Sequence, residues 1–242
     1  MSKPILYSGF GLLFLSLFGH PVSYAAATAY DLPFLNEHLH YDVKFNGLET
    51  ASSQLECTAP DSEHILITWS LKSRSLYRMF FHVNNEYQTL VDVKTWLPDW
   101  VSKEVKQKNI NQKMKTSYDR QNLTAVTDNG LQWPVTDHCM DLLSMLYNTR
   151  LQLIENVDSL NYIIDLESHI WQINGKVDDK VVYTFSPALP IVDRSWKTDL
   201  MTNRISRPTT ILTVQFGPSP EYLPEQLLFD NGDSTVEMRL KK

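Results

Sequence analysis

The sequence predicts an all-β dominated protein: a large curled antiparallel sheet, or an open or half β-barrel, with one inserted helix near 137–153. Three observations support this fold class. More than ten segments alternate apolar and polar residues, which is typical of half-buried strands. Four Asn-Gly pairs punctuate them, and Asn-Gly is the strongest short signal for a hairpin turn. A single segment repeats apolar residues at helical spacing.

The first residues predict a signal peptide, which we place at 1–27. An apolar run at 5–18 follows Lys3 and is too short to span a bilayer, and cleavage anywhere near 25–29 fits the alanines there. The alternative is an uncleaved N-terminal anchor. No later stretch is apolar enough for a transmembrane segment. We therefore expect one β-rich domain at 30–242, located in the periplasm of a Gram-negative-type envelope.

The strands follow from period-two alternation with one polar face, which disfavours a parallel sheet buried on both faces. In 38–45, for example, Leu39, Tyr41 and Val43 share one face. We expect hairpin turns at the Asn-Gly pairs that begin at Asn46, Asn129, Asn174 and Asn231. The expected strands are 38–45, 50–57, 63–73, 76–83, 86–93, 101–107, 112–118, 122–126, 168–173, 179–185, 209–216, 226–229 and 235–240.

The helix is expected to begin at Asp137, a good N-cap residue, and to reach about residue 153. Its leucines would plug the concave side of the sheet. Asp141 and Arg150 complement the helix dipole, and Arg150 would pair with a carboxylate. The competing interpretation is an active-site helix with Ser144 as the nucleophile. That interpretation lacks a base and a Gly-x-Ser-x-Gly turn, so we favour the plug and expect no catalytic residue.

A curled sheet of this size tends to enclose more room than one helix fills, which predicts a ligand groove. The candidate groove residues are Asp141, Ser144, Tyr147, Arg150, Trp69 and Tyr41. His38 and His40 would form half of a metal site, but no third ligand is recognisable, so we expect neither a metal nor a cofactor.

The charge pattern limits the classes of binding partner that we expect. A net charge of −6 argues against broad nucleic-acid binding. One basic region stands out, and it contains Lys103, Lys106, Lys108, Lys113 and Lys115. It would meet anionic lipid headgroups or acidic polysaccharide, or else form the solvated face of a long hairpin.

The two cysteines, Cys57 and Cys139, leave two alternatives open. Export permits a disulfide, which would close a loop of about 80 residues and stabilise the fold by on the order of 4 kcal/mol. The other alternative is two buried free thiols, since the sequence does not give the distance between them.

The segment "MDLLSMLYNTR" resembles the motif Asp-x-Leu-Ser-x-Leu-Tyr-x-x-Arg of domain of unknown function family 3108, a family of bacterial exported proteins. "NEHLHYDVKFNGLETAS" is similar to the opening strand of that family, and "YLPEQLLFDNGDSTVEMRL" to its closing hairpin. Asn36 and Leu142 replace the usual glycine and proline. The resemblance implies export and an all-β curled sheet with one inserted helix, and it implies no catalytic activity.

Three functions remain open. The leading hypothesis is a non-catalytic envelope protein that binds a lipid, a glycan or an envelope partner through its concave sheet. The alternative is a structural or assembly factor of an outer-membrane complex. A hydrolase is the third and least favoured.

Overall fold

The structure is a computed structural model that describes residues 28–80, 82–107, 109–190, 199, 202 and 207–241. The expected signal peptide therefore lies outside the described residues. The helical elements whose full bounds lie within these ranges are two short turns, η1 (Ala29–Asp31) and α1 (Ser75–Arg78), and the long helix α2 (Leu142–Ile154).

The described strands form a single fifteen-stranded sheet, in the order β8-β7-β6-β5-β4-β3-β2-β1-β15-β14-β13-β12-β11-β10-β9. Neighbouring strands are antiparallel except for β9 and β10, which are parallel. The strands are β1 (His38–Phe45), β2 (Leu48–Thr58), β3 (His64–Ser73), β4 (Val83–Asp92), β5 (Pro98–Gln107), β6 (Ile110–Asp119), β7 (Thr124–Thr127), β8 (Gln132–Pro134), β9 (Cys139–Met140), β10 (Ser159–Leu166), β11 (His169–Val177), β12 (Val181–Pro187), β13 (Ile211–Phe216), β14 (Pro224–Asp230) and β15 (Thr235–Leu240).

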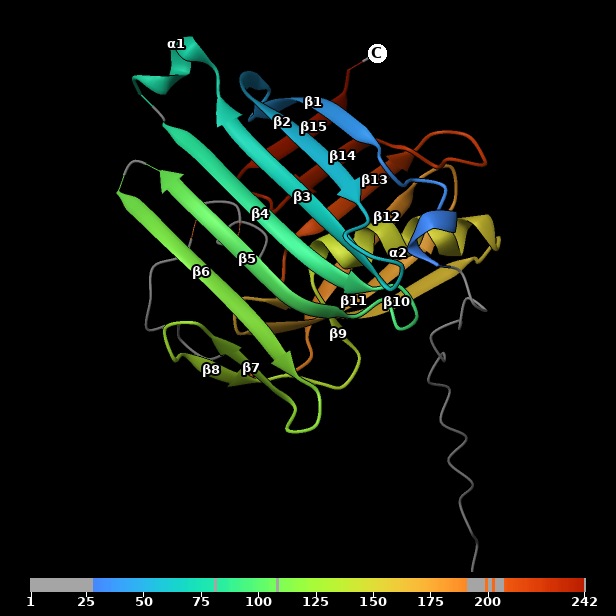
Figure 1. Ribbon diagram of the computed structural model, residues 1–242. Helices are drawn as coiled ribbons and strands as arrows, with labels where there is room; N and C mark the ends of the chain where they lie inside the picture. The colour runs from blue at the N-terminus through green and yellow to red at the C-terminus, as the bar shows by residue number, and fades with distance from the viewer. Residues whose placement is uncertain are drawn as a thin grey trace, which may run out of the picture.

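The sheet curls around α2, as the sequence predicts. Figure 1 shows β2–β5 crossing in front of β11–β14 with α2 between the two layers. The two halves of the chain meet where β1 pairs with β15, and β8 and β9 are the two edges of the open sheet. The fold class expected from the alternation and the turn signals is therefore confirmed.

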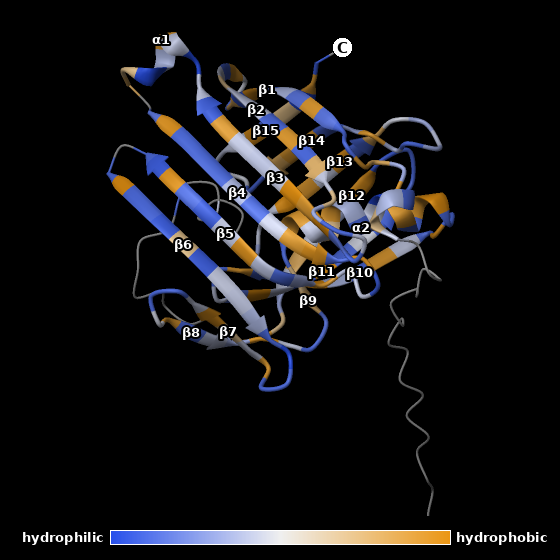
Figure 2. Ribbon diagram, in the orientation of Figure 1, coloured by the Kyte–Doolittle hydropathy of each residue, from blue (hydrophilic) through white to orange (hydrophobic). Residues whose placement is uncertain are grey.

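Alternation places the core on the concave side. In β3, Ile65, Ile67, Trp69 and Leu71 are buried while most residues between them are partly exposed. Figure 2 shows the corresponding alternation of hydrophobic and hydrophilic bands along the front strands. These side chains meet the apolar residues of α2 in one large buried cluster.

Three of the four Asn-Gly predictions are confirmed and one is wrong. Gly47, Gly130 and Gly232 lie in turns with φ of 80°, 87° and 84°. Gly175 instead lies inside β11, opposite Tyr183 of β12. A Cβ built at Gly175 would lie 2.7 Å from the Tyr183 ring, so glycine is needed there for close approach rather than for turning.

Several element boundaries also differ from the expectation. The segment predicted as a strand at 76–83 contains most of α1, and β4 begins only at Val83. The short strands β8 and β9 and the long strand β10 were missed. In β10 the burial alternates from Ser159 to Ile164 and is lost only in the last two residues, so the strand carried a signal that the sequence prediction overlooked.

The helix begins four residues later than predicted. Asp141, not Asp137, is the N-cap, because Cys139 and Met140 pair with β10 and form β9. The Asp141 carboxylate accepts hydrogen bonds from the backbone N–H groups of Leu143 and Ser144, at 3.0 Å each. Ser144 Oγ in turn accepts from the Asp141 N–H at 3.0 Å, which completes a capping box.

The two cysteines do not form a disulfide. Cys57 lies in β2 within the main cluster, whereas Cys139 lies in β9 within a second cluster around Trp133 and Ile170. Both thiols are free and buried, and burial raises the pKa of Cys57 to about 12. The second alternative from the sequence, two buried free thiols, is the observed one.

Gly175 offers a test of the close approach between β11 and β12. Replacing it with alanine forces the buried Tyr183 ring to shift, so we expect Gly175→Ala to lower the free energy of unfolding by about 1–3 kcal/mol. The control is Gly217→Ala, whose new methyl group would make ordinary contact with the Glu225 side chain and should change stability by less than about 0.5 kcal/mol. Urea unfolding measures both, and equal effects would contradict the assignment.

Candidate functional site

A cavity of about 110 Å³ lies at the N-terminal end of α2. We call it the interior pocket. It is enclosed by β3–β6, β8, β10 and the first residues of α2. Of the six groove candidates, Trp69 and Asp141 line it, whereas Ser144, Tyr147, Arg150 and Tyr41 do not.

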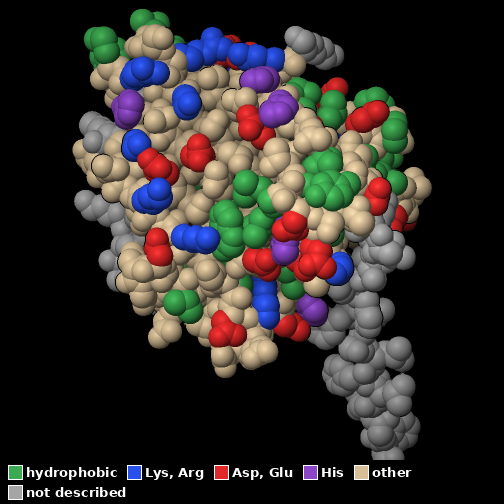
Figure 3. Space-filling model, in the orientation of Figure 1, with side chains coloured by type: hydrophobic (Ala, Val, Ile, Leu, Met, Phe, Trp, Pro, Cys, Tyr) green, Lys and Arg blue, Asp and Glu red, His purple; other side chains and the backbone are tan. Residues whose placement is uncertain are grey.

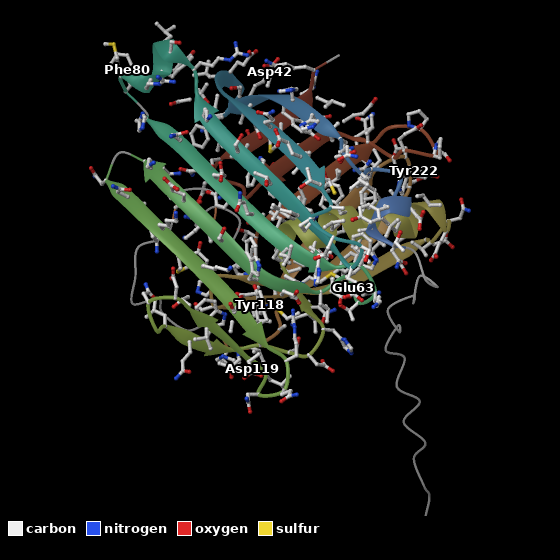
Figure 4. The ribbon with its side chains drawn as sticks, viewed as in Figure 1. Asp42, Glu63, Phe80, Tyr118, Asp119 and Tyr222 are labelled. Carbon is white, nitrogen blue, oxygen red and sulfur yellow. The ribbon has the colours of Figure 1, made fainter. Side chains whose placement is uncertain are left out.

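Aromatic side chains form much of the pocket wall. Trp69 and Tyr87 stack with ring centroids 5.0 Å apart, and the Trp69 indole N–H donates to Ser53 Oγ at 2.6 Å. Tyr118 of β6, which is labelled in Figure 4, and Trp133 of β8 also line it. Trp69 and Trp133 are buried, and Tyr87 and Tyr118 are partly buried, so the apolar wall is preformed.

Asp141 joins the helix to the sheet at the edge of the pocket. Its Oδ2 accepts from Thr89 Oγ1 at 2.8 Å, which ties α2 to β4. Its Oδ1 accepts from Ser144 Oγ at 2.6 Å. Ser144 is completely buried, and its hydroxyl is used in the cap. This arrangement positions a helix end, and it leaves Ser144 facing neither the pocket nor a histidine base.

The prediction that Lys103 belongs to a basic surface is wrong. It is only 6% exposed and points into the pocket, where it forms an ion pair with Glu167. Asp199 lies 3.7 Å from its Nζ, and Thr202 Oγ1 donates to Asp199 at 2.7 Å. Lys103 lies two residues before the buried Val105 on β5 and therefore shares its face, and this period of two is the sequence signal that would have assigned Lys103 to the concave face.

The other described lysines of the predicted basic region make different contacts. Lys106 pairs with Glu104 at 2.5 Å, and Lys113 lies 3.9 Å from the same carboxylate. Lys115 lies over the Trp100 ring, 4.1 Å from its centroid. Lys108 is outside the described residues. Lys106, Lys113 and Lys115 are exposed and so belong to the solvated outer face of the β5–β6 hairpin.

Asp165 is a buried titratable group that sequence reasoning missed. Its Oδ2 accepts from the Trp133 indole N–H at 2.9 Å and from the Tyr118 hydroxyl at 3.3 Å, and its Oδ1 accepts from the Ser168 N–H at 2.9 Å. These donors favour the carboxylate, but burial dominates and raises the pKa of Asp165 to about 7. The pocket therefore contains a carboxyl group that changes charge near neutral pH.

Most of the concave face beyond this pocket is filled. A second cavity, between α2 and β2, β3 and β13–β15, has a volume of only about 20 Å³ and is lined entirely by apolar residues such as Leu55, Leu146 and Phe229. That is room for about one water molecule. The helix therefore fills the interior along most of its length, and the open space lies at its N-terminal end.

Arg150 and Tyr147 lie toward the opposite end of the helix, away from the pocket. Arg150 is 1% exposed and pairs with Glu37 at 2.6 Å, and the Tyr147 hydroxyl donates to the same Glu37 oxygen at 2.5 Å. The guanidinium also donates to the Glu221 carbonyl, at 2.9 and 3.2 Å, and lies over the Phe34 ring. The expectation that Arg150 pairs with a carboxylate is confirmed. We call Phe34, Glu37, Tyr147 and Arg150 the Arg150 cluster.

Tyr41 also has a structural role. It is completely buried in β1, and its hydroxyl donates to the Pro224 carbonyl at 2.9 Å. This bond links β1 to the start of β14, the second strand away in the sheet. Tyr41 thus fastens the joint between the two halves of the chain rather than lining a ligand site.

The described residues contain neither a recognisable metal site nor a membrane-spanning helix. In the described part of the chain, no three His, Cys, Asp or Glu side chains are grouped as metal ligands. The Nδ1 atom of His38 instead lies 3.4 Å from the Oε1 atom of Glu56. No described helix combines the length and apolar character needed to cross a bilayer.

Comparisons with known proteins support the fold alone. No family model and no curated protein matches the chain. Among solved structures, it is similar to a β-barrel-like protein of domain of unknown function DUF1849 from Brucella abortus. The TM-score is 0.56 at 7% identity, and the match covers 85% of this chain and 95% of that one. Nearly the whole curled architecture is therefore shared with a known structure.

The Arg150 cluster can be tested by removing its cation. Arg150→Met leaves the largely buried Glu37 without its cation, so we expect the free energy of unfolding to fall by about 3–5 kcal/mol. The control is Arg239→Met, which breaks an exposed pair with Glu237 and should cost at most about 1 kcal/mol. Adding Glu37→Gln to Arg150→Met should recover part of the loss. Additive effects of Arg150→Met and Glu37→Gln would contradict direct pairing.

The raised pKa of Asp165 predicts how the free energy of unfolding depends on pH. Below about pH 4 this carboxyl is protonated in both states. Between about pH 4 and 7 the folded protein holds a proton that the unfolded chain has released. The free energy of unfolding therefore falls as pH rises, by up to roughly 1.4 kcal/mol per unit from this group, and levels off above about pH 7.

Urea unfolding at several pH values measures this contribution. Asp165→Asn removes a contribution to the free energy of unfolding that decreases as pH rises. Between pH 5 and 7 we therefore expect the free energy of unfolding to fall less steeply with pH, or rise more steeply, in this variant than in the wild type. Asp128→Asn, at an exposed aspartate, should leave the slope of the wild type unchanged. Equal slopes in the wild type and Asp165→Asn would show that Asp165 is ionised throughout that range.

Proposed function

We propose that the protein is a non-catalytic binding protein of the cell envelope, which takes part of a lipid, a glycan or an envelope partner into the interior pocket. The observation that supports this most is the pocket itself, a preformed space with aromatic walls and a few buried polar groups. Its export rests on the N-terminal sequence pattern.

The pocket volume limits what can enter. A dry cavity of about 150 Å³ holds a benzene molecule, so about 110 Å³ admits a somewhat smaller group. A whole lipid does not fit beside α2. We therefore propose that one end of the ligand enters, against Trp69 and Tyr87, and that the rest stays outside the pocket. Lys103 with its acidic partners and Asp165 would supply the polar contacts that orient it.

The local chemistry supports binding over hydrolysis. Ser144, the one nucleophile that the helix offered, is buried and bonded to Asp141. Cys139 is buried as well, and burial raises the pKa of its thiol well above the usual value, which disfavours the reactive thiolate. A hydrolase would have to use other groups.

The assembly-factor alternative would use the two edges of the sheet. Those edges are β8, with three residues, and β9, with two. They cover only part of the strands beside them, because β7 pairs with Thr116–Asp119 of β6 and β9 with Ile163 and Ile164 of β10. Strand addition by a partner would therefore have to use the remaining outer edges of β6 and β10.

A pocket-filling variant tests the proposal. Val101 lines the pocket, so Val101→Phe should fill it and displace any ligand that the protein carries when isolated from envelope extracts. Native mass spectrometry should then detect an additional acyl or glycan mass on the wild type but not on Val101→Phe. Val126→Phe, on the exposed side of β7, is the matched control and should keep that mass.

Two results would contradict the proposal. One is a wild type without any bound species that captures an outer-membrane complex, which would support the assembly role. The other is a hydrolytic activity of the wild type that Ser144→Ala abolishes, which would support the enzyme.

A further inference from the structure

The connection between β3 and β4 carries apolar side chains on its outside. Leu76, Met79 and Phe80 are 75%, 86% and 78% exposed, more than any other large hydrophobic residue in the described part of the chain. They belong to α1 and to the turn that follows it. Figure 4 shows Phe80 at the far end of this projection, away from the body of the sheet. We call these three residues the α1 tip.

Hydrogen bonds and ion pairs at the base of the α1 tip hold it in its projecting shape. The Arg74 N–H donates to the Thr50 carbonyl at 2.9 Å, which ties the start of the connection to β2. The Arg74 guanidinium pairs with Asp42 at 2.6 Å and also with Glu49. The next turn is closed by N–H bonds from Tyr77 and Arg78 to the Arg74 carbonyl, at 3.0 Å each. The base is therefore fixed to β1 and β2 while the apolar side chains face solvent.

Two cations flank the tip in a chain whose net charge is −6. Arg78 is exposed on α1, and Lys72 is exposed at the end of β3. Neither lies within ion-pair distance of a carboxylate among the described residues. In the sheet register, Lys72 opposes Asn84, which in turn opposes Lys106, so a second lysine lies in the same row. Figure 3 shows Lys and Arg side chains gathered beside the hydrophobic tip at the upper left.

We propose that the α1 tip inserts into the interface of a bilayer that contains anionic lipids, with Arg78 and Lys72 at the level of the headgroups. A convex tip with three apolar side chains suits a fluid interface, whereas a protein partner would need a matching groove. The flanking cations match the negative surface of such a bilayer, and their aliphatic stems extend the apolar area. This inference goes beyond the proposed function, because it names a docking surface separate from the interior pocket.

Vesicle co-sedimentation of the purified full chain tests the proposal. The probe is a vesicle of phosphatidylcholine with phosphatidylglycerol, and all variants carry the same N-terminal segment. Replacing Leu76, Met79 and Phe80 together with serine should weaken partitioning by at least roughly tenfold. The matched control replaces Tyr30, Leu123 and Val126, which are exposed apolar residues elsewhere on the surface, and should bind as the wild type does.

Charge is tested separately. Lys72→Glu with Arg78→Glu should weaken binding to the anionic vesicles by more than about fivefold for each residue, since charge reversal removes an attraction and adds a repulsion. Binding to vesicles of phosphatidylcholine alone should change little. If the serine variant and its control bind equally, or if the wild type does not bind the anionic vesicles, the proposal is wrong. It is equally wrong if the tip substitutions abolish capture of an envelope protein but not binding to vesicles.

An environment-sensitive dye reports whether the tip itself enters the interface. The label on Met79→Cys should shift its emission to the blue when anionic vesicles are added, and the label on Leu123→Cys should not. The native thiols of Cys57 and Cys139 are buried, and burial raises the pKa of both, so they compete poorly for the dye. Val101→Phe should bind vesicles like the wild type, so failure of the pocket and failure of the tip give different results.

Discussion

The burial of α2 on nearly all sides is the constraint on which the rest of the structure depends. Ten of its thirteen residues are buried, and they include the polar residues Ser144, Thr149 and Arg150. A helix of this kind has no face that it can leave to solvent, so a flat sheet would cover only one side of it. The sheet must therefore curl until strands from both halves of the chain enclose the helix.

Three polar groups of α2 and its N-cap then find partners in different regions of the chain. Asp141 at the N-cap binds Thr89 of β4, and Thr149 lies 2.6 Å from the Tyr183 hydroxyl of β12. Arg150 binds Glu37, just ahead of β1. Gly175 contributes indirectly, because its missing side chain lets the Tyr183 ring lie against β11. The helix thus joins strands that are far apart in the sequence, and space remains at its N-terminal end, where the interior pocket lies.

The sequence predicts those features that are local. Alternation identifies β1 and β3 almost to the residue, and Asn46-Gly47 marks the turn between β1 and β2, because both signals arise from residues a few positions apart. The helix start was wrong because Asp137 and Asp141 are equally good N-caps, and only the pairing of β9 with β10 selects Asp141. Tertiary pairing overrides a local preference in this case.

The candidate site was less predictable because its residues come from separate elements. Asp165 and Glu167 follow the helix, whereas Lys103 lies on β5, and only the curl of the sheet brings them together. Carboxylate pairing was expected for Arg150, but Glu37 lies 113 residues away and carries no signal of its own. Of the groove candidates, Trp69 and Asp141 reach the pocket, while Tyr41, Ser144, Tyr147 and Arg150 hold the fold together.

Hydrogen–deuterium exchange along the chain tests most directly whether α2 is the fixed centre of the fold. If the sheet is closed around it, the amides of 145–154 should exchange only through global unfolding, as slowly as the central strands β1 and β15. Faster exchange of α2, with a lower free energy of opening than those strands, would mean that the helix leaves the sheet independently, and it would contradict this account.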